Sequence, residues 1–268
     1  LPVPVLALNR GGPVPPGHAS FALVPEDEGV ALALRMQRRA LQRVVAVVSA
    51  DDSAQRALAA FRERHERAGG SLLTTISIDE RGIDFQAAIR TALEAAGLPT
   101  SAPVELDEPH DPGFDALFIA VRAPAARLLV PQLKLFGLSE VPMLATSQVY
   151  AAGEDARMDR DLSGVEFVES PWLVDEMAEL PARRDLARHL PSASGPAARL
   201  FAFGMDAWSL GQLRLGNDPG QLVRGATGLL GFDELGETVR EPAIAVFRGG
   251  LPRRVEEAAL VPERGPQG

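Results

Sequence analysis

The sequence predicts an α/β protein with a parallel sheet and helices on both of its faces. Two observations lead to this fold class. Short apolar runs alternate with amphipathic segments over residues 25–147, and the pattern changes after about residue 168. Strands that alternate with helices are typical of a parallel sheet that carries helices on both faces. We therefore expect four βα-type units in the segment 25–147.

The first part of the chain already shows this alternation. Residues 3–8 form a short apolar run that ends at Asn9 and a Gly/Pro-rich loop, which predicts a buried strand, and 21–24 is a second extended piece. A helix is expected from Pro25, because proline followed by three carboxylates suits the positive end of the helix dipole. Residues 43–49, RVVAVVS, are typical of a parallel strand that is covered on both sides.

The alternation continues and then gives way to longer helices and a hairpin. Asp51 is expected to cap a helix that ends at Gly69-Gly70. Further strands are predicted at 72–78, 114–121, 141–145 and 164–168, and further helices at 84–96, 124–136, 174–190 (broken at Pro181) and 197–215. Residues 225–247 predict a β-hairpin whose turn lies at 233–236.

Composition limits the possible functions. The 268 residues are 46% hydrophobic and 24% charged, with a net charge of −9, which argues against a nucleic-acid partner. The chain has no cysteine, so disulfides, thiolate metal sites and a cysteine nucleophile are excluded. No apolar run approaches the roughly 20 residues of a membrane span. The opening LPVPVLAL predicts a strand rather than a targeting segment, so we expect a processed polypeptide or one that starts inside a domain.

Several sequence motifs point to one protein family. The segment 141–172 contains ATS at the end of a predicted strand, followed by Tyr150, DLSGVEF and PW. Further motifs are VLALN at 5–9, FALVPEDE at 21–28, RLFAFGMDAW at 199–208 and GATGLLGFDELGETVRE at 225–241. Together they resemble the LppC/LpoA family, outer-membrane lipoproteins that activate penicillin-binding proteins. The motifs span nearly the whole chain.

The order of the predicted elements also resembles a type I periplasmic binding protein, a fold in which three crossings join two Rossmann-like lobes with parallel sheets. It places residues 1–24 and 165–224 in a first lobe and residues 25–147 in a second lobe. The first lobe would be incomplete at its N-terminus, because the chain begins at what resembles that lobe's fourth strand. Inter-lobe crossings and the hairpin are expected at 148–164 and 225–250, followed by a tail at 251–268.

The sequence gives no sign of a catalytic or metal site. The histidines, His18, His65, His110 and His189, are scattered and show no spacing typical of metal ligands. The glycine-rich phosphate-binding motifs and the G-x-S-x-G nucleophile motif do not occur. No two carboxylates can be paired as general acid and base. We therefore predict no catalytic residue, no metal and no cofactor, and the protein is not expected to be an enzyme.

Polar residues at predicted strand ends are candidates for an inter-lobe cleft, because ligands of open α/β sheets meet the carboxyl ends of the strands. These candidates are Asn9, Ser49, Asp51, Arg122, Thr146, Ser147 and Tyr150. The alternative is that they only cap helices and bond loops. Trp172, Asp206 and Trp208 are expected to pack beside the hinge, although a tryptophan could also stack on a sugar or a partner.

The resemblance implies a non-enzymatic regulator of peptidoglycan synthesis. As part of a lipoprotein, this chain would bind a class A penicillin-binding protein, a peptidoglycan synthase, and stimulate its transpeptidase. The protein would lie in the periplasm, tethered to the inner face of the outer membrane by a lipid anchor outside this chain. The alternative is a periplasmic solute receptor that closes on an amino acid or another small ligand. The loops at 50–52 and 122–123 carry no aromatic residue to clamp such a small-molecule ligand, which favours the regulator.

Overall fold

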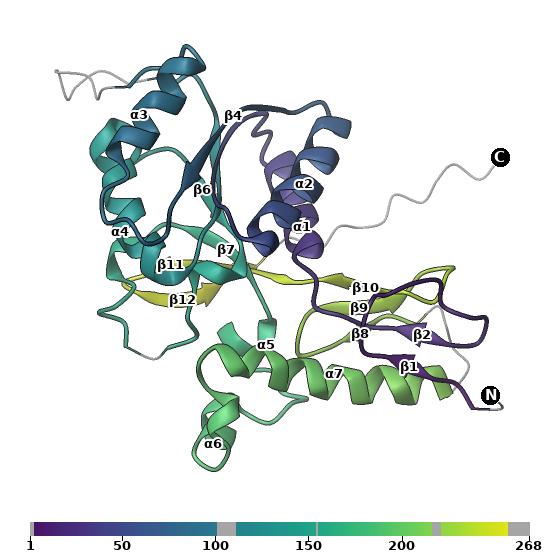
Figure 1. Cartoon of the computed structure of the whole chain (residues 1–268). Coiled ribbons are helices and arrows are strands. Elements are labelled where there is room, and N and C mark those ends of the chain that lie inside the picture. The colour runs from purple at the N-terminus through teal and green to yellow at the C-terminus, as the bar shows by residue number, and fades with distance from the viewer. Residues whose placement is uncertain (1–2, 101–110, 154, 216–220, 257–268) are drawn as a thin grey trace.

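The chain folds into a large lobe, at the upper left of Figure 1, and a small lobe at the lower right. The structure is a computed structural model that describes residues 3–100, 111–153, 155–215 and 221–256. The large lobe is built on a seven-stranded sheet with helices on both faces. The small lobe consists of short strands and one long helix. The predicted α/β class with two lobes is confirmed.

The sheet of the large lobe has the strand order β12-β11-β7-β6-β5-β3-β4. Its strands are β3 (Arg43–Ser49), β4 (Ser71–Ile78), β5 (Ala116–Ala120), β6 (Met143–Ala145), β7 (Glu166–Glu169), β11 (Ala243–Arg248) and β12 (Leu251–Arg254). Strands β3 to β7 pair in parallel, whereas β11 is antiparallel to both β7 and β12. The predicted parallel sheet is therefore extended at one side by an antiparallel pair.

Two pairs of helices cover the two faces of this sheet. Helices α1 (Pro25–Arg38) and α2 (Asp52–Arg67) lie on one face, and α3 (Gln86–Ala95) and α4 (Ala123–Leu133) lie on the other. The side chains of β3 alternate accordingly: Val44, Ala46 and Val48 pack with the first pair, and Val45 and Val47 with the second. A strand that is buried on both faces needs the continuous apolar run that the sequence provides.

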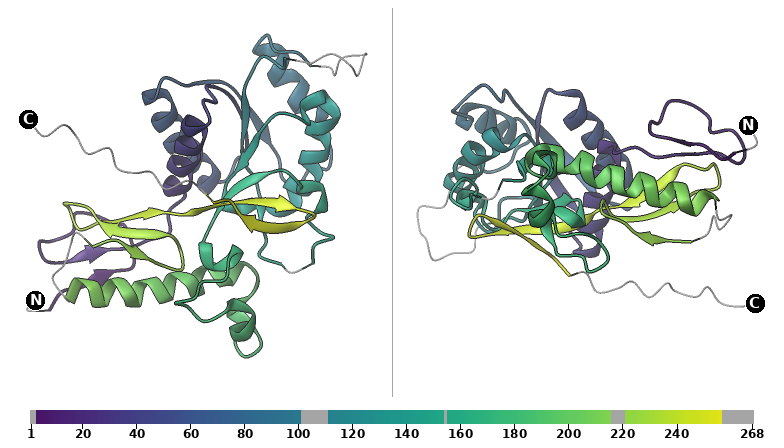
Figure 2. Two further views of the ribbon diagram at one scale, coloured as in Figure 1. Left: turned by 180° about the vertical axis from the view of Figure 1, so that it is seen from behind. Right: turned by 90° about the horizontal axis from the view of Figure 1, so that it is seen from below.

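The small lobe has strands covered by a helix on one face only. Its strands are β1 (Leu6–Ala7), β2 (Ala19–Ser20), β8 (Val223–Arg224), β9 (Leu229–Phe232) and β10 (Thr238–Glu241). A bridge between Ser20 and Glu237 joins the β1-β2 pair to the β8-β9-β10 sheet. Helix α7 (Ala198–Leu215) runs along one side of these strands, as both views of Figure 2 show. Phe21, Leu210 and Leu230 form the small core between them.

The chain crosses between the lobes at residues 21–24, at residues 170–197 and at Pro242, which separates β10 from β11 (Figure 1). The remaining elements are short: η1 (Lys134–Leu138), η2 (Ser147–Val149), η3 (Arg160–Leu162), α5 (Pro171–Val174), α6 (Arg183–Ala187), η4 (Pro191–Ala193) and η5 (Gly195–Ala197). Among the described residues, no helix is long and apolar enough to cross a membrane.

The helices begin and end where local chemistry requires it. Pro25 occupies the first turn of α1 with Glu26, Asp27 and Glu28 beside it, so the carboxylates face the positive end of the helix. Asp51 caps α2, because its side chain accepts a hydrogen bond from the backbone N–H of Ala54 at 3.1 Å. The helix predicted at 84–96 begins only after Phe85, where Gln86 starts α3.

The predicted position of the strand at 164–168 was wrong. It was assigned to the first lobe, but β7 pairs in parallel with β6 in the large lobe, with Leu144 opposite Glu166. The described residues 148–153 and 155–164 therefore stay in the large lobe and do not form the predicted crossing. The same sheet also takes in β11, from the predicted crossing at 225–250, and β12, from the predicted tail. Sequence pattern indicates that a strand exists but not which neighbour it pairs with.

The helix predicted at 174–190 does not form. Only α5, with 4 residues, and α6, with 5 residues, occur in this region. Pro181 lies between them, and proline both lacks a backbone donor and disfavours the helical conformation of the residue before it. The carbonyl of Pro181 instead accepts a hydrogen bond from Nε1 of Trp172 at 2.8 Å.

The predicted strand at 3–8 is shorter and less buried than expected. Only Leu6 and Ala7 pair as β1, and Val3, Val5 and Leu8 are 57%, 41% and 55% exposed. The reason is that α7 covers one face of the small-lobe strands, and within the described residues Leu6 packs on that side. By contrast, the hairpin predicted at 225–247 forms over residues 229–241, with β9 and β10 antiparallel around the predicted turn at 233–236, while residues 243–247 belong to β11 of the large lobe.

Candidate functional site

The strand order reverses between β3 and β5, since β4 lies on one side of β3 and β5 on the other. Such a switch point is where open α/β sheets bind ligands. Ser49, Asp51 and Arg122 lie there and line an open depression of about 770 Å³. Three of the predicted cleft residues therefore lie together, but all residues that line this depression belong to the large lobe.

The polar groups at this switch point are bonded to one another. Ser49 Oγ donates to Asp51 at 2.5 Å, and Arg122 lies 3.4 Å from Glu80 and 3.8 Å from Asp51. Burial alone would raise the pKa of Asp51, but hydrogen bonds from Ser49 and the backbone of Ala54 lower it overall. These contacts match the alternative reading of the sequence, in which strand-end residues cap helices and bond loops.

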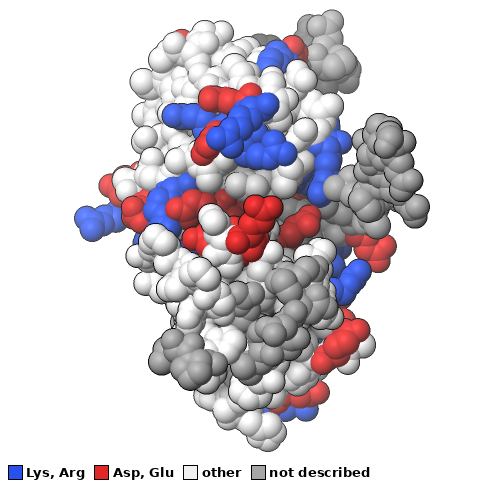
Figure 3. Space-filling model, turned by 90° about the vertical axis from the view of Figure 1, so that its right-hand side faces the viewer, with Lys and Arg blue, Asp and Glu red and all other residues white. Residues whose placement is uncertain are grey.

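A second, smaller cavity of about 120 Å³ lies at the junction of the lobes. Side chains of both lobes and of the first and last crossings line it. The charged and polar ones are Glu28, Ser53, Thr146, Ser147, Gln148, Glu169, Ser170, Arg199 and Arg240. Figure 3 shows acidic and basic side chains gathered across the waist of the molecule. We take this junction as the candidate functional site.

Arg199 is the most highly connected residue of the junction. It belongs to α7, and its guanidinium donates to both carboxylate oxygens of Glu169, with Nε at 3.0 and 3.1 Å. Nη2 also donates to the backbone carbonyls of Ser147 and Tyr150, each at 2.8 Å. Burial alone would lower the pKa of Arg199, but the neighbouring Glu169 carboxylate raises it. A charged guanidinium therefore ties the helix of the small lobe to two segments of the large lobe.

Arg240 makes a second connection from strand β10. Its Nε lies 3.2 Å from Asp27 at the start of α1, and Nη1 donates to the carbonyl of Thr227 at 3.3 Å. Arg10 also approaches Asp27, at 3.5 Å. Burial nevertheless raises the pKa of Asp27 above its usual value, because it outweighs the attraction of the two arginines.

Glu28 and Ser147 join the first helix of the large lobe to the end of β6. The carboxylate of Glu28 accepts hydrogen bonds from the backbone N–H of Ser147 at 2.8 Å and from Ser147 Oγ at 2.7 Å. Removal of the carboxylate from solvent raises the pKa of Glu28. Beside it, Thr146 Oγ1 and Gln148 Oε1 are buried and have no hydrogen-bond partner among the described residues.

Asp206 and Trp172 fix the adjoining part of the small lobe. Asp206 accepts hydrogen bonds from the backbone of Ala226 at 2.6 Å and from the backbone and hydroxyl of Thr227 at 2.7 and 2.6 Å. Trp172 is 2% exposed and stacks on Phe201 of α7 with ring centroids 5.5 Å apart. Its backbone N–H donates to Ala226 at 3.1 Å, so both residues converge on the same loop.

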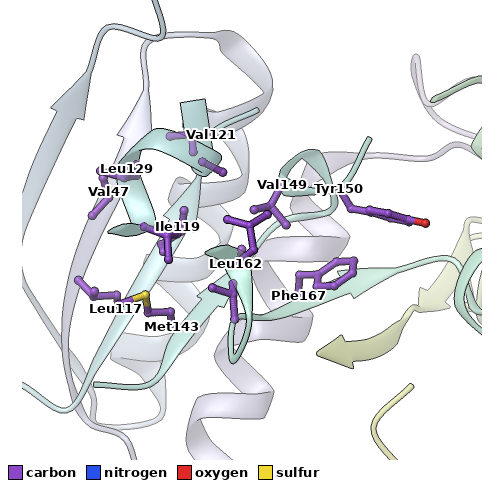
Figure 4. Packing of buried hydrophobic residues seen from close by; sticks show 14 of the residues in the cluster. Val47, Leu117, Ile119, Val121, Leu129, Met143, Val149, Tyr150, Leu162 and Phe167 are labelled. Carbon is purple, nitrogen blue, oxygen red and sulfur yellow. The ribbon is translucent and has the colours of Figure 1, made fainter. Parts of the chain in front are cut away.

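Three predicted site residues lie elsewhere. Tyr150 is 2% exposed and packs in the core of the large lobe with Phe167 (Figure 4), while its hydroxyl donates to the carbonyl of Gly153. Burial raises its pKa to about 12. Asn9 is an exposed loop residue and is not among the residues lining either cavity described above. Trp208 is 72% exposed on the outer side of α7, so its predicted packing beside the hinge was wrong.

Sequence reasoning missed the charged residues that dominate the junction. Four of them, Glu28, Glu169, Arg199 and Arg240, lie within or beside the family motifs, but none is among the predicted cleft residues. Their spacing along the chain, 119 residues between Glu28 and Ser147 for example, carries no local signal. The available signal was the occurrence of charged residues at the ends of otherwise apolar segments.

The contacts of the arginines hold the two lobes against each other. The arginines are engaged by carboxylates and carbonyls of the chain itself, and among the described residues no group of three His, Cys, Asp or Glu is placed to hold a metal ion. The site therefore joins two lobes.

Comparison with known proteins decides the family. The profile of the family described as "LppC putative lipoprotein" matches residues 1–250. The chain belongs to this LppC family. Among curated relatives, it is 27% identical over 259 residues to "Penicillin-binding protein activator LpoA" of Edwardsiella ictaluri, and 28% identical over 255 residues to the protein of the same name in Dickeya chrysanthemi. These alignments cover 85% and 84% of the chain but only 37% and 36% of the relatives.

Solved structures show the fold expected of an LppC family member. The LpoA (YraM) C-domain from Haemophilus influenzae, described as a regulator of PBP1A, superposes with a TM-score of 0.71 at 20% identity, covering 94% of this chain and 74% of that one. The leucine-binding protein LivK from Thermotoga maritima superposes with a TM-score of 0.61 at 15% identity, covering 89% and 67%. The type I periplasmic-binding-protein fold is therefore confirmed.

Proposed function

We propose that this chain is the part of a lipoprotein that binds a class A penicillin-binding protein and stimulates its transpeptidase. The protein would act in the periplasm, held at the inner face of the outer membrane by a lipid anchor. Membership of the LppC family and relatives named as penicillin-binding protein activators support this function. The chain spans about 37% of the length of the Edwardsiella relative, so the proposal concerns the longer protein of which it forms a part.

The observation that carries the proposal is the way in which the lobe junction is filled. A receptor needs an accessible polar space between its lobes, but here Arg199 and Arg240 occupy that region and are bonded to Glu169 and Asp27. The cavity that these two arginines line measures about 120 Å³, and a more open space of about 500 Å³ lies between other residues of the two lobes. A domain that binds no solute can still regulate an enzyme, provided that it contacts the active conformation better than the inactive one.

A peptidoglycan cross-linking assay tests the regulator. The complete lipoprotein is added to its cognate class A synthase with lipid-linked precursor, and the fraction of cross-linked muropeptides is measured. We expect this fraction to rise, and to rise less when the synthase is not cognate. An unchanged fraction, with a synthase that is active on its own, contradicts the proposal.

A second candidate function rests on two unpaired acceptors. Among the described residues, Thr146 Oγ1 and Gln148 Oε1 are buried without a hydrogen-bond partner beside the junction cavity, and such groups gain from a ligand that donates hydrogen bonds. A small amino compound would satisfy them if the chain were a solute receptor. A thermal-shift screen with amino acids distinguishes the candidates, since a receptor's melting temperature rises by several degrees with saturating ligand. No shift with any of them favours the regulator.

A further inference from the structure

The side chains of two arginines of the small lobe reach carboxylates of the large lobe. Arg199 leaves α7 and Arg240 leaves β10, yet their guanidinium groups meet Glu169 at the end of β7 and Asp27 at the start of α1. The side chain of Glu169 is 1% exposed and that of Arg240 is 4% exposed. Both arginines line the same junction cavity. The lobes are thus connected by charged side chains as well as by the backbone crossings.

The contacts of Arg199 restrict the orientation of α7 relative to the large lobe as well as its distance from it. The guanidinium of Arg199 contacts the carboxylate of Glu169 at the end of β7 and the carbonyls of Ser147 and Tyr150 in and beside η2. These are two different segments of the large lobe. A planar fork with several acceptors fixes orientation, unlike a single contact between two charges. Any rotation of α7 relative to the large lobe must break at least one of these contacts.

Arg240 adds a separate point of attachment. It holds Asp27 of the large lobe while its Nη1 is bonded to Thr227, whose backbone and hydroxyl are in turn bound by Asp206 of α7. Arg10 reinforces the same point, because it lies 3.5 Å from Asp27 and donates to the carbonyl of Thr238 at 2.7 Å. The two arginines therefore hold elements of the small lobe that are themselves joined.

We propose that Arg199 and Arg240 form a clamp that keeps the two lobes in one fixed orientation. Receptors of this architecture close by rotation of one lobe about the hinge. Here such a rotation would leave a buried carboxylate or guanidinium without its partner, which is strongly unfavourable. The clamped chain is a rigid body in which the surfaces of the large lobe and the small lobe keep a constant spacing. This inference concerns the chain itself and stands independently of the proposed synthase partner.

Distance measurement by pulsed electron paramagnetic resonance tests the clamp. The chain has no cysteine, so Glu66→Cys on α2 and Gln212→Cys on α7 place one spin label on each lobe at exposed positions. We expect one narrow distance distribution in the otherwise unchanged chain. With Arg199→Met and Arg240→Met added, the distribution should broaden to at least twice its width or acquire a second maximum.

A matched control removes an arginine that does not bridge the lobes. Arg157 is exposed and pairs with Asp155 two positions away, so Arg157→Met should leave the narrow distribution unchanged. The clamp is refuted if the unsubstituted chain already shows a broad or double distribution. It is also refuted if the double variant keeps the narrow one with native circular dichroism. Should the double variant fail to fold, Arg199→Lys and Arg240→Lys retain the charges without the fork and must still broaden the distribution.

Discussion

Three carboxyl groups near the lobe junction have raised pKa values, because the effect of burial there exceeds the effect of their hydrogen-bond and charged partners. Burial raises the pKa of Glu28, Asp27 and Asp206 above their usual values, although each accepts hydrogen bonds or faces an arginine. For Asp115, in the large lobe, burial also acts to raise the pKa, but hydrogen bonds from Arg43 and the Gln42 backbone lower it overall. The junction therefore holds carboxyl groups whose ionisation opposes folding.

The raised pKa of Glu28 leads to a testable pH dependence. A carboxyl group with a higher pKa in the folded state binds more protons there than when unfolded, so its contribution to stability falls as pH rises above its unfolded pKa. Glu28→Gln removes this titration and keeps an oxygen that can accept from Ser147. We expect the free energy of unfolding of the variant, relative to the unsubstituted chain, to be higher at pH 8 than at pH 5. Urea unfolding of both proteins at both pH values measures this difference in the free energy of unfolding. An equal difference at pH 5 and pH 8 would contradict a raised pKa of Glu28.

Loss of Arg199 should be costly because its partner cannot reach solvent. Arg199→Met leaves the carboxylate of Glu169, 1% exposed, buried without its counter-charge, and breaking a buried pair in this way costs about 3–5 kcal/mol. Urea unfolding of this variant measures the loss. Arg157→Met is the control, since both members of its ion pair are largely exposed and such pairs contribute little. Similar losses in the two variants would contradict a structural role for Arg199.

At the scale of elements, the close contact of α1 with α2 depends on Gly29. A Cβ atom at this position would lie 2.1 Å from the carbonyl oxygen of Ala57 on α2, so the two helices could not approach as they do. The same residue type occurs in α7 without such a constraint. A Cβ at Gly204 would meet no atom within 4 Å.

These two glycines give opposite predictions for one substitution. Gly29→Ala pushes the backbones of α1 and α2 apart, and it should destabilise the chain by about 1–3 kcal/mol. Gly204→Ala should stabilise it by up to about 1 kcal/mol, because alanine is the better helix former and space is available. Thermal unfolding of both variants measures the two effects. A destabilising Gly204→Ala, or a neutral Gly29→Ala, would show that the helices are packed differently.

Across the whole molecule, the small lobe carries exposed apolar side chains. Leu200 and Trp208 on the outer side of α7 are 69% and 72% exposed, and Leu222 just before β8 and Val239 on β10 are 64% and 56% exposed. The lower part of the surface in Figure 3 is correspondingly poor in charged side chains where it is described. Large exposed apolar side chains favour association where they meet a partner surface.

Trp208 should therefore affect association more than folding. Trp208→Gln changes an exposed side chain, and we expect the free energy of unfolding to move by no more than about 0.5 kcal/mol while self-association at high concentration decreases. Sedimentation velocity measures the association. Trp172→Gln is the matched control, because this buried indole stacks on Phe201 and its loss should destabilise the chain by about 3 kcal/mol. Equal destabilisation by both substitutions would contradict this description.

The sequence predicted local features better than distant ones. The strand at 43–49 and the hairpin turn at 233–236 follow from β-branched runs and turn residues, and both are confirmed. The place of β7 was missed, because the partner of a strand depends on residues far along the chain. The same reason hid Arg199, whose acceptors lie 30 to 52 residues away. Exposure of Trp208 could not be inferred either, since a helix pattern does not show which face is covered.

Binding to the synthase tests the proposed function most directly. The cognate class A penicillin-binding protein is immobilised in a form that still reacts with a fluorescent penicillin, and the complete lipoprotein is passed over it in a surface plasmon resonance measurement. We expect saturable binding that an excess of this chain reduces. Absence of binding by the complete lipoprotein to the reactive synthase would contradict it.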